Sequence, residues 1–257
     1  MNYIHALILG IVEGVSEFLP ISSTFHLIIA SDLLRLTQDE SLKLFQVAIQ
    51  AGAILAVIRM YGMSIWKDFK LMKVTILAFI PTMIVGFVLY GAIKGIFFQT
   101  RLLNEIVFIA VGVIFIIFER KKIAIENTKT LPELKPNQAI LIGLCQALAV
   151  IPGVSRAGAV MIGMMGMGFS RVESARFSFL LAVPTILAAS SYDLFKMRDI
   201  LMNSHDLIGF IIVGGVIAFL SAYISVKWLV GYLQKNDLMI FGWWRVIIGL
   251  LLIFLRP

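Results

Sequence analysis

Two glutamates four residues apart, Glu13 and Glu17, lie in the strongly apolar N-terminal segment LILGIVEGVSEFLPISSTFHLII. At this spacing both carboxylates lie on one face of a helix, where like charges repel each other. A bare carboxylate in hydrocarbon also costs several kcal/mol, so such groups are kept only where something neutralises them. The pair therefore predicts a partner: a divalent cation, a shared proton or a cationic side chain.

Hydroxyl and imidazole groups follow the pair directly, in Ser22, Ser23, Thr24 and His26. Ser22 or Ser23 is expected at a helix N-cap, where free backbone N–H groups and the helix dipole favour an anion. Taken singly, these hydroxyls are more often helix caps than catalysts, and His26 alone is as readily a packing histidine as a base. Beside two carboxylates, they indicate a reaction centre within the membrane.

A second polar break, IPGVSRAG, contains Ser155 and Arg156. Ser155 is expected to cap a helix as well, and the planar guanidinium of Arg156 can grip a phosphate in two places. An arginine in mid-membrane needs an anionic partner. Together the two segments predict a phosphate or diphosphate site, while a purely structural ion pair of the glutamates with Arg156 is the alternative.

Composition places these residues in a polytopic membrane protein. Of the 257 residues, 60% are hydrophobic and 14% are charged, with a mean hydropathy of +0.97. Ordinary soluble domains contain about 25% charged residues. The net charge of +7 fits basic cytoplasmic loops and gives no case for nucleic-acid binding, and the single cysteine excludes an internal disulfide.

The sequence resembles itself at an offset of 132 to 133 residues. GIVEGVSEFLPISS from Gly10 aligns with GLCQALAVIPGVSR from Gly143, and FQVAIQAGAILA aligns with FSFLLAVPTILA. Matches in order at one offset predict an internal duplication. We expect a single membrane domain, with repeat one at about 1–120, a cytoplasmic linker at about 121–136 and repeat two at about 137–257.

Each repeat begins with an apolar segment that is broken at its centre, at 20–24 and at 152–156. The arms are too short to cross a bilayer, so each broken segment predicts a re-entrant helix hairpin. Three apolar spans then follow in each repeat, at about 42–61, 72–94 and 104–119, and at about 174–193, 206–228 and 238–256. The expected fold is all-α, and three crossings per repeat require two inverted-topology repeats.

Loop charges orient this arrangement. With the N-terminus outside, thirteen lysines and arginines fall on the inner side and seven on the outer side. That excess agrees with the positive-inside rule. The two hairpins would then enter from opposite faces and meet near the middle of the membrane, which is also the plan of many transporters.

At these residues the chain resembles the undecaprenyl-diphosphatase family, membrane enzymes linked to bacitracin resistance. The matching segments are EGVSEFLPISSTFH, IPGVSRAG, FQVAIQAGAILAV and ARFSFLLAVPTILAA. The resemblance implies hydrolysis of undecaprenyl diphosphate to undecaprenyl phosphate and inorganic phosphate, which recycles the lipid carrier of cell-wall synthesis. It implies a cytoplasmic-membrane location, with the active site open to the outer face. The expected partners are a polyprenyl diphosphate lipid and the bilayer, and a homodimer is compatible with the sequence.

The resemblance also implies roles for the residues above. Catalytic positions fall on Glu13, Glu17, Ser23, His26 and Arg156. Ser155 is also among the family's catalytic positions, and Ser22 and Thr24 lie in the same motif. From the chemistry of the residues, we expect Ser22, Thr24, Ser155 and Arg156 to bind the diphosphate, and Glu13 and Glu17 to hold Mg²⁺ or another divalent cation. The chain departs from the family pattern at Phe25, where Gly is usual, and at Ala157 and Val160, where hydroxyl residues are usual. These departures bear on substrate fit and rate more than on chemistry.

Two questions stay open at the level of sequence. The attacking group is Ser23 activated by His26 or Glu17, or His26 itself, or a metal-positioned water. The alternative function is a flippase or transporter of a polyprenyl phosphate, which the inverted repeats would suit. Holding an anion does not need two carboxylates without a metal, and this favours the phosphatase.

Overall fold

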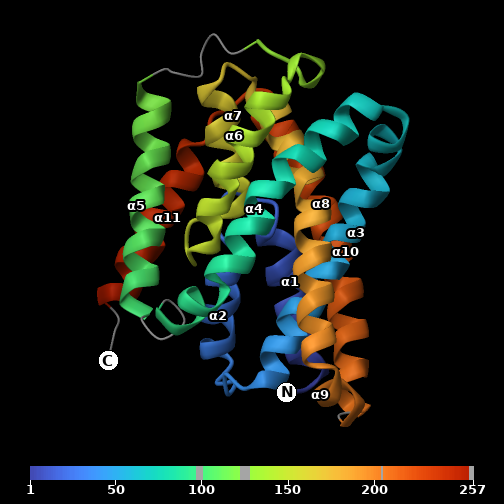
Figure 1. Ribbon diagram of the computed structural model, residues 1–257. Helices are drawn as coiled ribbons and strands as arrows, with labels where there is room; N and C mark the ends of the chain where they lie inside the picture. Colours follow the sequence, from blue (N-terminus) through green and yellow to red (C-terminus); the bar gives the residue numbers. More distant parts are fainter. Residues whose placement is uncertain (97–100, 122–127, 204, 255–257) are drawn as a thin grey trace.

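The protein is a bundle of helices in the computed structural model, which describes residues 1–96, 101–121, 128–203 and 205–254 (Figure 1). These residues contain no β-strand, and a single isolated bridge joins Lys129 to Phe169. The all-α fold class is therefore confirmed for the described part of the chain.

The helices follow one another with short connections. In chain order they are α1 (Tyr3–Ser16), α2 (Ser23–Leu33), α3 (Glu40–Lys67), α4 (Phe69–Ile96), α5 (Arg101–Arg120), η1 (Leu131–Glu133), α6 (Pro136–Ala147), η2 (Leu148–Val150), α7 (Arg156–Gly166), α8 (Arg171–Lys196), α9 (Arg198–Asn203), α10 (His205–Leu233) and α11 (Met239–Phe254).

Five helices of the described chain are long and apolar enough to cross a membrane, so the protein is a multi-pass membrane protein. They comprise Glu40–Lys67, Phe69–Leu89, Leu102–Arg120, Arg171–Lys196 and Asp206–Leu233. Each coincides with a predicted span, because an uninterrupted apolar run of this length satisfies its own backbone hydrogen bonds as a helix. The sixth predicted span, 238–256, corresponds to α11, whose last predicted residues lie outside the described part of the chain.

Each predicted break contains a non-helical loop, but both loops begin and end earlier than predicted, because Ser23 and Thr24 already belong to α2 and Arg156 already belongs to α7. Helix α1 ends at Ser16, so residues 17–22 form the first loop, and residues 151–155 form the second loop, after η2. Pro20 and Pro152 lie inside these loops, where a residue that lacks an N–H donor and disfavours helix just before it is readily accommodated. Pro81 and Pro184, in contrast, lie inside α4 and α8. The arms α1, α2, α6 and α7 have 14, 11, 12 and 11 residues, so the longest spans only about 21 Å at about 1.5 Å per residue.

Helix packing pairs the two halves of the chain. Helix α1 packs on α10 and α6 packs on α4, while α3 contacts α8 and α5 contacts α11. Small residues allow these close approaches: a Cβ atom at Gly10 would meet the carbonyl oxygen of Gly214, and one at Gly143 would meet that of Ala78. In Figure 1 the N-terminus, α2 and α9 lie at the lower end of the bundle, and α6 and α7 lie toward the upper end.

The described part of the predicted linker is folded against the bundle. Leu134 is fully buried, the backbone N–H of Leu131 donates to Glu173 on α8, and Lys70 on α4 donates to the carbonyl of Pro132. Residues 122–127 of the linker lie outside the described part of the chain.

Candidate active site

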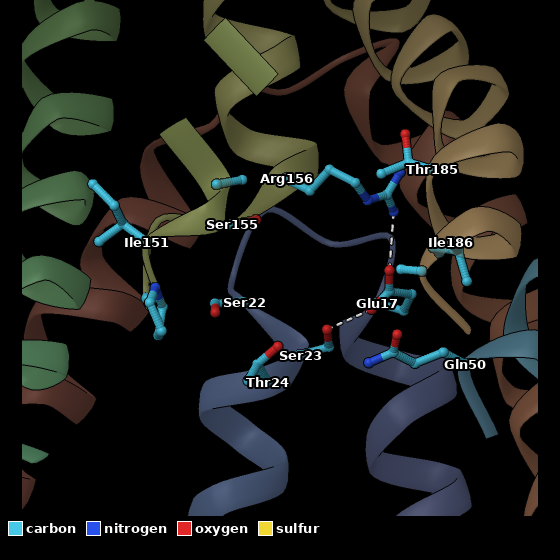
Figure 2. A pocket seen from close by; sticks show the side chains of 14 residues that line it. Glu17, Ser22, Ser23, Thr24, Gln50, Ile151, Ser155, Arg156, Thr185 and Ile186 are labelled. Atoms are coloured by element: carbon cyan, nitrogen blue, oxygen red, sulfur yellow. Dashed lines mark hydrogen bonds and ion pairs between the residues drawn. The ribbon is translucent and has the colours of Figure 1, made fainter. Parts of the chain in front are cut away.

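A cavity of about 180 Å³ opens where the two loops meet, near the centre of the bundle (Figure 2). The first loop and the start of α2 contribute side chains from below in this view, and Ser155 and Arg156 enter from above. The lining residues are Glu17, Ser22, Ser23, Thr24, Gln50, Ala149, Ile151, Pro152, Gly153, Ser155, Arg156, Thr185, Ile186 and Ala189. Six of the eight predicted site residues line this cavity, and Glu13 and His26 do not.

The helices that enter the cavity begin in the same way in both repeats. Ser22 is the N-cap of α2 with φ 68° and ψ 95°, and Ser155 is the N-cap of α7 with φ 75° and ψ 115°. Such positive φ values are uncommon outside glycine, and these two serines occupy equivalent positions of the repeat. Both helices direct their N-terminal N–H groups and positive dipole ends toward the cavity, which favours an anion there.

Glu17 connects the two halves of the site. Its Oε1 accepts a hydrogen bond from Nη2 of Arg156 at 3.0 Å, and its Oε2 accepts one from the hydroxyl of Ser23. Arg156 is also fixed by a bond from Nη1 to the carbonyl oxygen of Ser178 on α8, at 3.2 Å. The buried pair therefore brings an acidic group, a hydroxyl and a guanidinium from both hairpins to one point (Figure 2).

Glu13 lies on α1, one helical turn before Glu17, and is fully buried. Neither of its carboxylate oxygens has a hydrogen-bond donor, although it interacts electrostatically with both Glu17 and Arg156. A buried carboxylate without a donor is costly, so this position fits a cation or a shared proton. Among the described residues, no cluster of three or more His, Cys, Asp or Glu could hold a metal. Two carboxylates suit Mg²⁺, which takes the rest of its shell from phosphate and water.

His26 lies outside the cavity lining, one turn into α2. Its Nδ1 is 2.8 Å from the carbonyl oxygen of Ser22, so Nδ1 carries the proton and donates. Its Nε2 then accepts a hydrogen bond from the indole N–H of Trp244 on α11, at 3.1 Å, and the two rings are stacked with centroids 6.2 Å apart. Both ring nitrogens are thus engaged with the protein in this conformation.

Two polar residues that line the cavity, Gln50 and Thr185, were not singled out from the sequence. Gln50 on α3 and Thr185 on α8 line the cavity, and Gln146 donates to the hydroxyls of Thr185 at 3.1 Å and Thr82 at 2.8 Å. Gln146 occupies the position in repeat two that Glu13 holds in repeat one. The signal for Gln50 was present, because it lies in the repeated segment FQVAIQAGAILA, but its direction toward the cavity depends on how α3 packs.

The three departures from the family pattern are packed in the protein interior. The ring of Phe25 stacks on that of Phe108 with centroids 4.0 Å apart, and Ala157 and Val160 are at most 1% exposed. Their side chains therefore fill space beside the loops and do not line the cavity.

The chain is similar to known proteins over almost its whole length. The family model described as "Bacitracin resistance protein BacA" matches residues 6–251. A protein of Campylobacter fetus subsp. fetus (strain 82-40) is 44% identical, covering 97% of each chain, and one of Aquifex aeolicus (strain VF5) is 43% identical, covering 95% of each. A protein of Campylobacter hominis is 43% identical over 99% of each chain, and all three relatives are named "Undecaprenyl-diphosphatase". The chain therefore belongs to the bacitracin resistance protein BacA family.

Proposed function

We propose that the protein hydrolyses undecaprenyl diphosphate to undecaprenyl phosphate and inorganic phosphate. The names of its relatives support this, and one observation carries the chemistry: Glu17 contacts the hydroxyl of Ser23 and the guanidinium of Arg156 at the same time. A carboxylate beside a hydroxyl can remove its proton, and a guanidinium beside both can hold a phosphoryl group.

Two inverted repeats, each a re-entrant hairpin plus three membrane-spanning helices, form the architecture that we propose for this single domain. The pairing of α1 with α10 and of α6 with α4 supports the symmetry, because exchange of the two repeats converts one pair into the other. The arms of both broken segments are too short to cross a bilayer, which supports the re-entrant hairpins. The positive-inside rule further favours an N-terminus outside the cytoplasm and a site in the cytoplasmic membrane that is open to the outer face.

The diphosphate would lie between the N-termini of α2 and α7. Arg156 and the hydroxyls of Ser22, Thr24 and Ser155 supply further donors around the same cavity. Donors fixed in advance around a transferring phosphoryl group account for most of the catalysis in such reactions. The cavity is too small for a long prenyl chain, so the tail would remain among the membrane helices.

Ser23 is the nucleophile that the geometry favours. As its oxygen bonds to the terminal phosphorus, its proton passes to Glu17, and the bond from that phosphorus to the bridging oxygen breaks to release undecaprenyl phosphate. Water then cleaves the phosphoserine and releases inorganic phosphate, while Ser23 regains a proton. His26 would contribute indirectly: its Nδ1–H donates to the carbonyl oxygen of Ser22 and would fix that carbonyl at the start of α2.

Glu13 and Glu17 are the residues that would hold a divalent cation, of which Mg²⁺ is the one we propose. When bound, the ion would neutralise part of the diphosphate charge and polarise the phosphorus–oxygen bond. The unsatisfied carboxylate of Glu13 supports this assignment.

Phosphate release by purified protein in detergent tests the proposal, with undecaprenyl diphosphate as substrate and with or without a chelator. We expect release that requires Ser23, and a phosphoserine at Ser23 that mass spectrometry detects after rapid acid quenching. A flippase has no activity in detergent, where two membrane sides do not exist. Absence of phosphate release from folded protein would therefore contradict the phosphatase and favour that alternative.

A further inference from the structure

Arg245 is a fully buried arginine of α11 that lies outside the cavity. A guanidinium cannot lose its charge easily, and burying it is costly unless its N–H groups are satisfied. The contacts that satisfy it therefore show what the residue does.

Three backbone carbonyls from three separate segments accept hydrogen bonds from Arg245. Nε donates to Phe108 on α5 at 3.1 Å, Nη1 donates to Pro20 in the first loop at 3.1 Å, and Nη2 donates to Gly153 in the second loop. The guanidinium also lies 4.5 Å from the ring centroid of Phe108 and 5.6 Å from that of Phe115. These cation–π contacts fix the plane of the Arg245 guanidinium.

The two loop carbonyls occupy equivalent positions. Pro20 aligns with Gly153 at the repeat offset of 133, and each precedes the positive-φ N-cap serine by two residues. One guanidinium thus binds the same point of both loops. Ser23 and Arg156 follow these carbonyls by three residues, so a shift of either loop would change their separation.

We propose that Arg245 is a positioning residue of the phosphatase reaction, which holds the two hairpin loops at the spacing that lets Glu17 and Ser23 meet Arg156. This inference rests on the proposed function, because its consequence is a change in catalysis. Arg245 itself touches neither the cavity nor the substrate, and it acts through the backbone of both loops.

Lysine and glutamine at position 245 test the inference. A lysine keeps a positive charge but lacks the planar fork that reaches three carbonyls, and a glutamine keeps some donors without the charge. Arg171→Lys is the matched control: Arg171 forms a two-point contact with Glu119 beside the N-terminal end of α11, away from the cavity. All variants are purified in detergent and compared for kcat, KM and hydrogen exchange.

We expect R245Q to lower kcat about 100-fold, since misplacement by about 1 Å has effects of this size. KM should change by less than about threefold, because the phosphate ligands remain. R245K should retain more activity than R245Q. Amides in residues 17–26 and 150–158 should exchange faster in both variants, while R171K keeps wild-type kcat and wild-type exchange in these loops.

Wild-type kcat in folded R245Q would overturn the inference, and so would faster exchange spread over the whole bundle. Failure of both R245Q and R245K to fold, with R171K folded, would assign Arg245 to stability alone and would equally overturn it. The proposed function is tested separately by the wild-type protein. If the wild type releases phosphate and the Arg245 variants match it, only this inference fails.

Discussion

Glu17 and Arg156 are 139 residues apart in the chain, and their charged groups lie 3.0 Å apart in the cavity. The contact joins the first loop, which contains Glu17, to the first turn of α7, which begins at Arg156. A buried pair of this kind is weak evidence for stability, because desolvation offsets much of the attraction. Its position at the meeting point of two helix N-termini indicates a site that is arranged for an anion.

Glu17→Gln removes the group that accepts the proton of Ser23, while an amide of the same size fills the space. We expect kcat to fall about 1,000-fold, within the range of general-base removal. Phosphate release in detergent measures this, with Glu40→Gln as the control, because Glu40 forms an exposed pair with Lys43 at the start of α3. Turnover of E17Q within tenfold of the wild type would remove Glu17 from the role of base.

Arg156→Lys keeps the positive charge but removes the planar guanidinium and its paired N–H donors. The variant cannot hold both Glu17 and the carbonyl of Ser178 as arginine does, so we expect a loss in kcat of about 100-fold, typical of one lost donor to a transferring group. Arg156→Ala should lose more. Equal activities of R156K and the wild type would show that only the charge at this position matters.

Most of the helical framework could be predicted because its cause is local. Long apolar runs specify spans, and prolines with polar neighbours, Pro20 and Pro152, mark interruptions, whereas Pro81 and Pro184 in apolar surroundings lie inside α4 and α8. Helix N-caps were likewise predicted at Ser22 or Ser23 and at Ser155. Ser22 and Ser155 occupy the N-cap positions with the same unusual backbone, but only the hydroxyl of Ser155 accepts a capping hydrogen bond, from the N–H of Gly158.

The contacts that complete the site could not be predicted, because they depend on how distant helices pack. Trp244 and His26 lie 218 residues apart in the chain, and no local pattern indicates that the indole of one donates a hydrogen bond to the imidazole of the other. The contacts of Arg245 with the backbone carbonyls of Pro20 and Gly153 are equally hidden, because every residue has a carbonyl and the sequence does not mark which ones accept. The role of Gln50 depends in the same way on the packing of α3.

Trp244→Phe tests whether His26 is held in place by the indole. Phenylalanine keeps the stacking but removes the donor to Nε2, so we expect kcat to fall several-fold. His26→Asn should be more harmful alone, and the double variant should resemble H26N. A double-mutant cycle should give a coupling free energy of about 1 kcal/mol, typical of one hydrogen bond. Additive effects would show that the two side chains act independently.

Glu119→Ala tests a contact at the N-terminal end of α11. The side chain of Glu119 is 1% exposed and accepts hydrogen bonds from Arg171 and from the backbone N–H of Leu238. Removing it leaves a guanidinium without its partner, and we expect a loss of about 3 kcal/mol in the free energy of unfolding. Thermal unfolding in detergent should detect this, while kcat at low temperature stays near wild type because the cavity is not touched. A fall in kcat at unchanged stability would show that this end of the bundle takes part in catalysis.

Glu13→Gln separates cation binding from the other functions of the acidic pair. Glu13 has two buried oxygens without donors and does not line the cavity, so its loss should weaken a bound cation more than it alters the phosphate contacts. We expect the Mg²⁺ concentration for half-maximal activity to rise at least about tenfold, as for the loss of groups that support a metal. Much of kcat should return at saturating Mg²⁺, and a chelator should suppress the wild type reversibly.

Gln146→Ala is the matched control, because Gln146 is the repeat equivalent of Glu13 and should leave the Mg²⁺ requirement unchanged. Activity of E13Q with a wild-type dependence on Mg²⁺ would show that Glu13 is not a ligand and would leave a proton shared with Glu17 as the means of neutralising the pair.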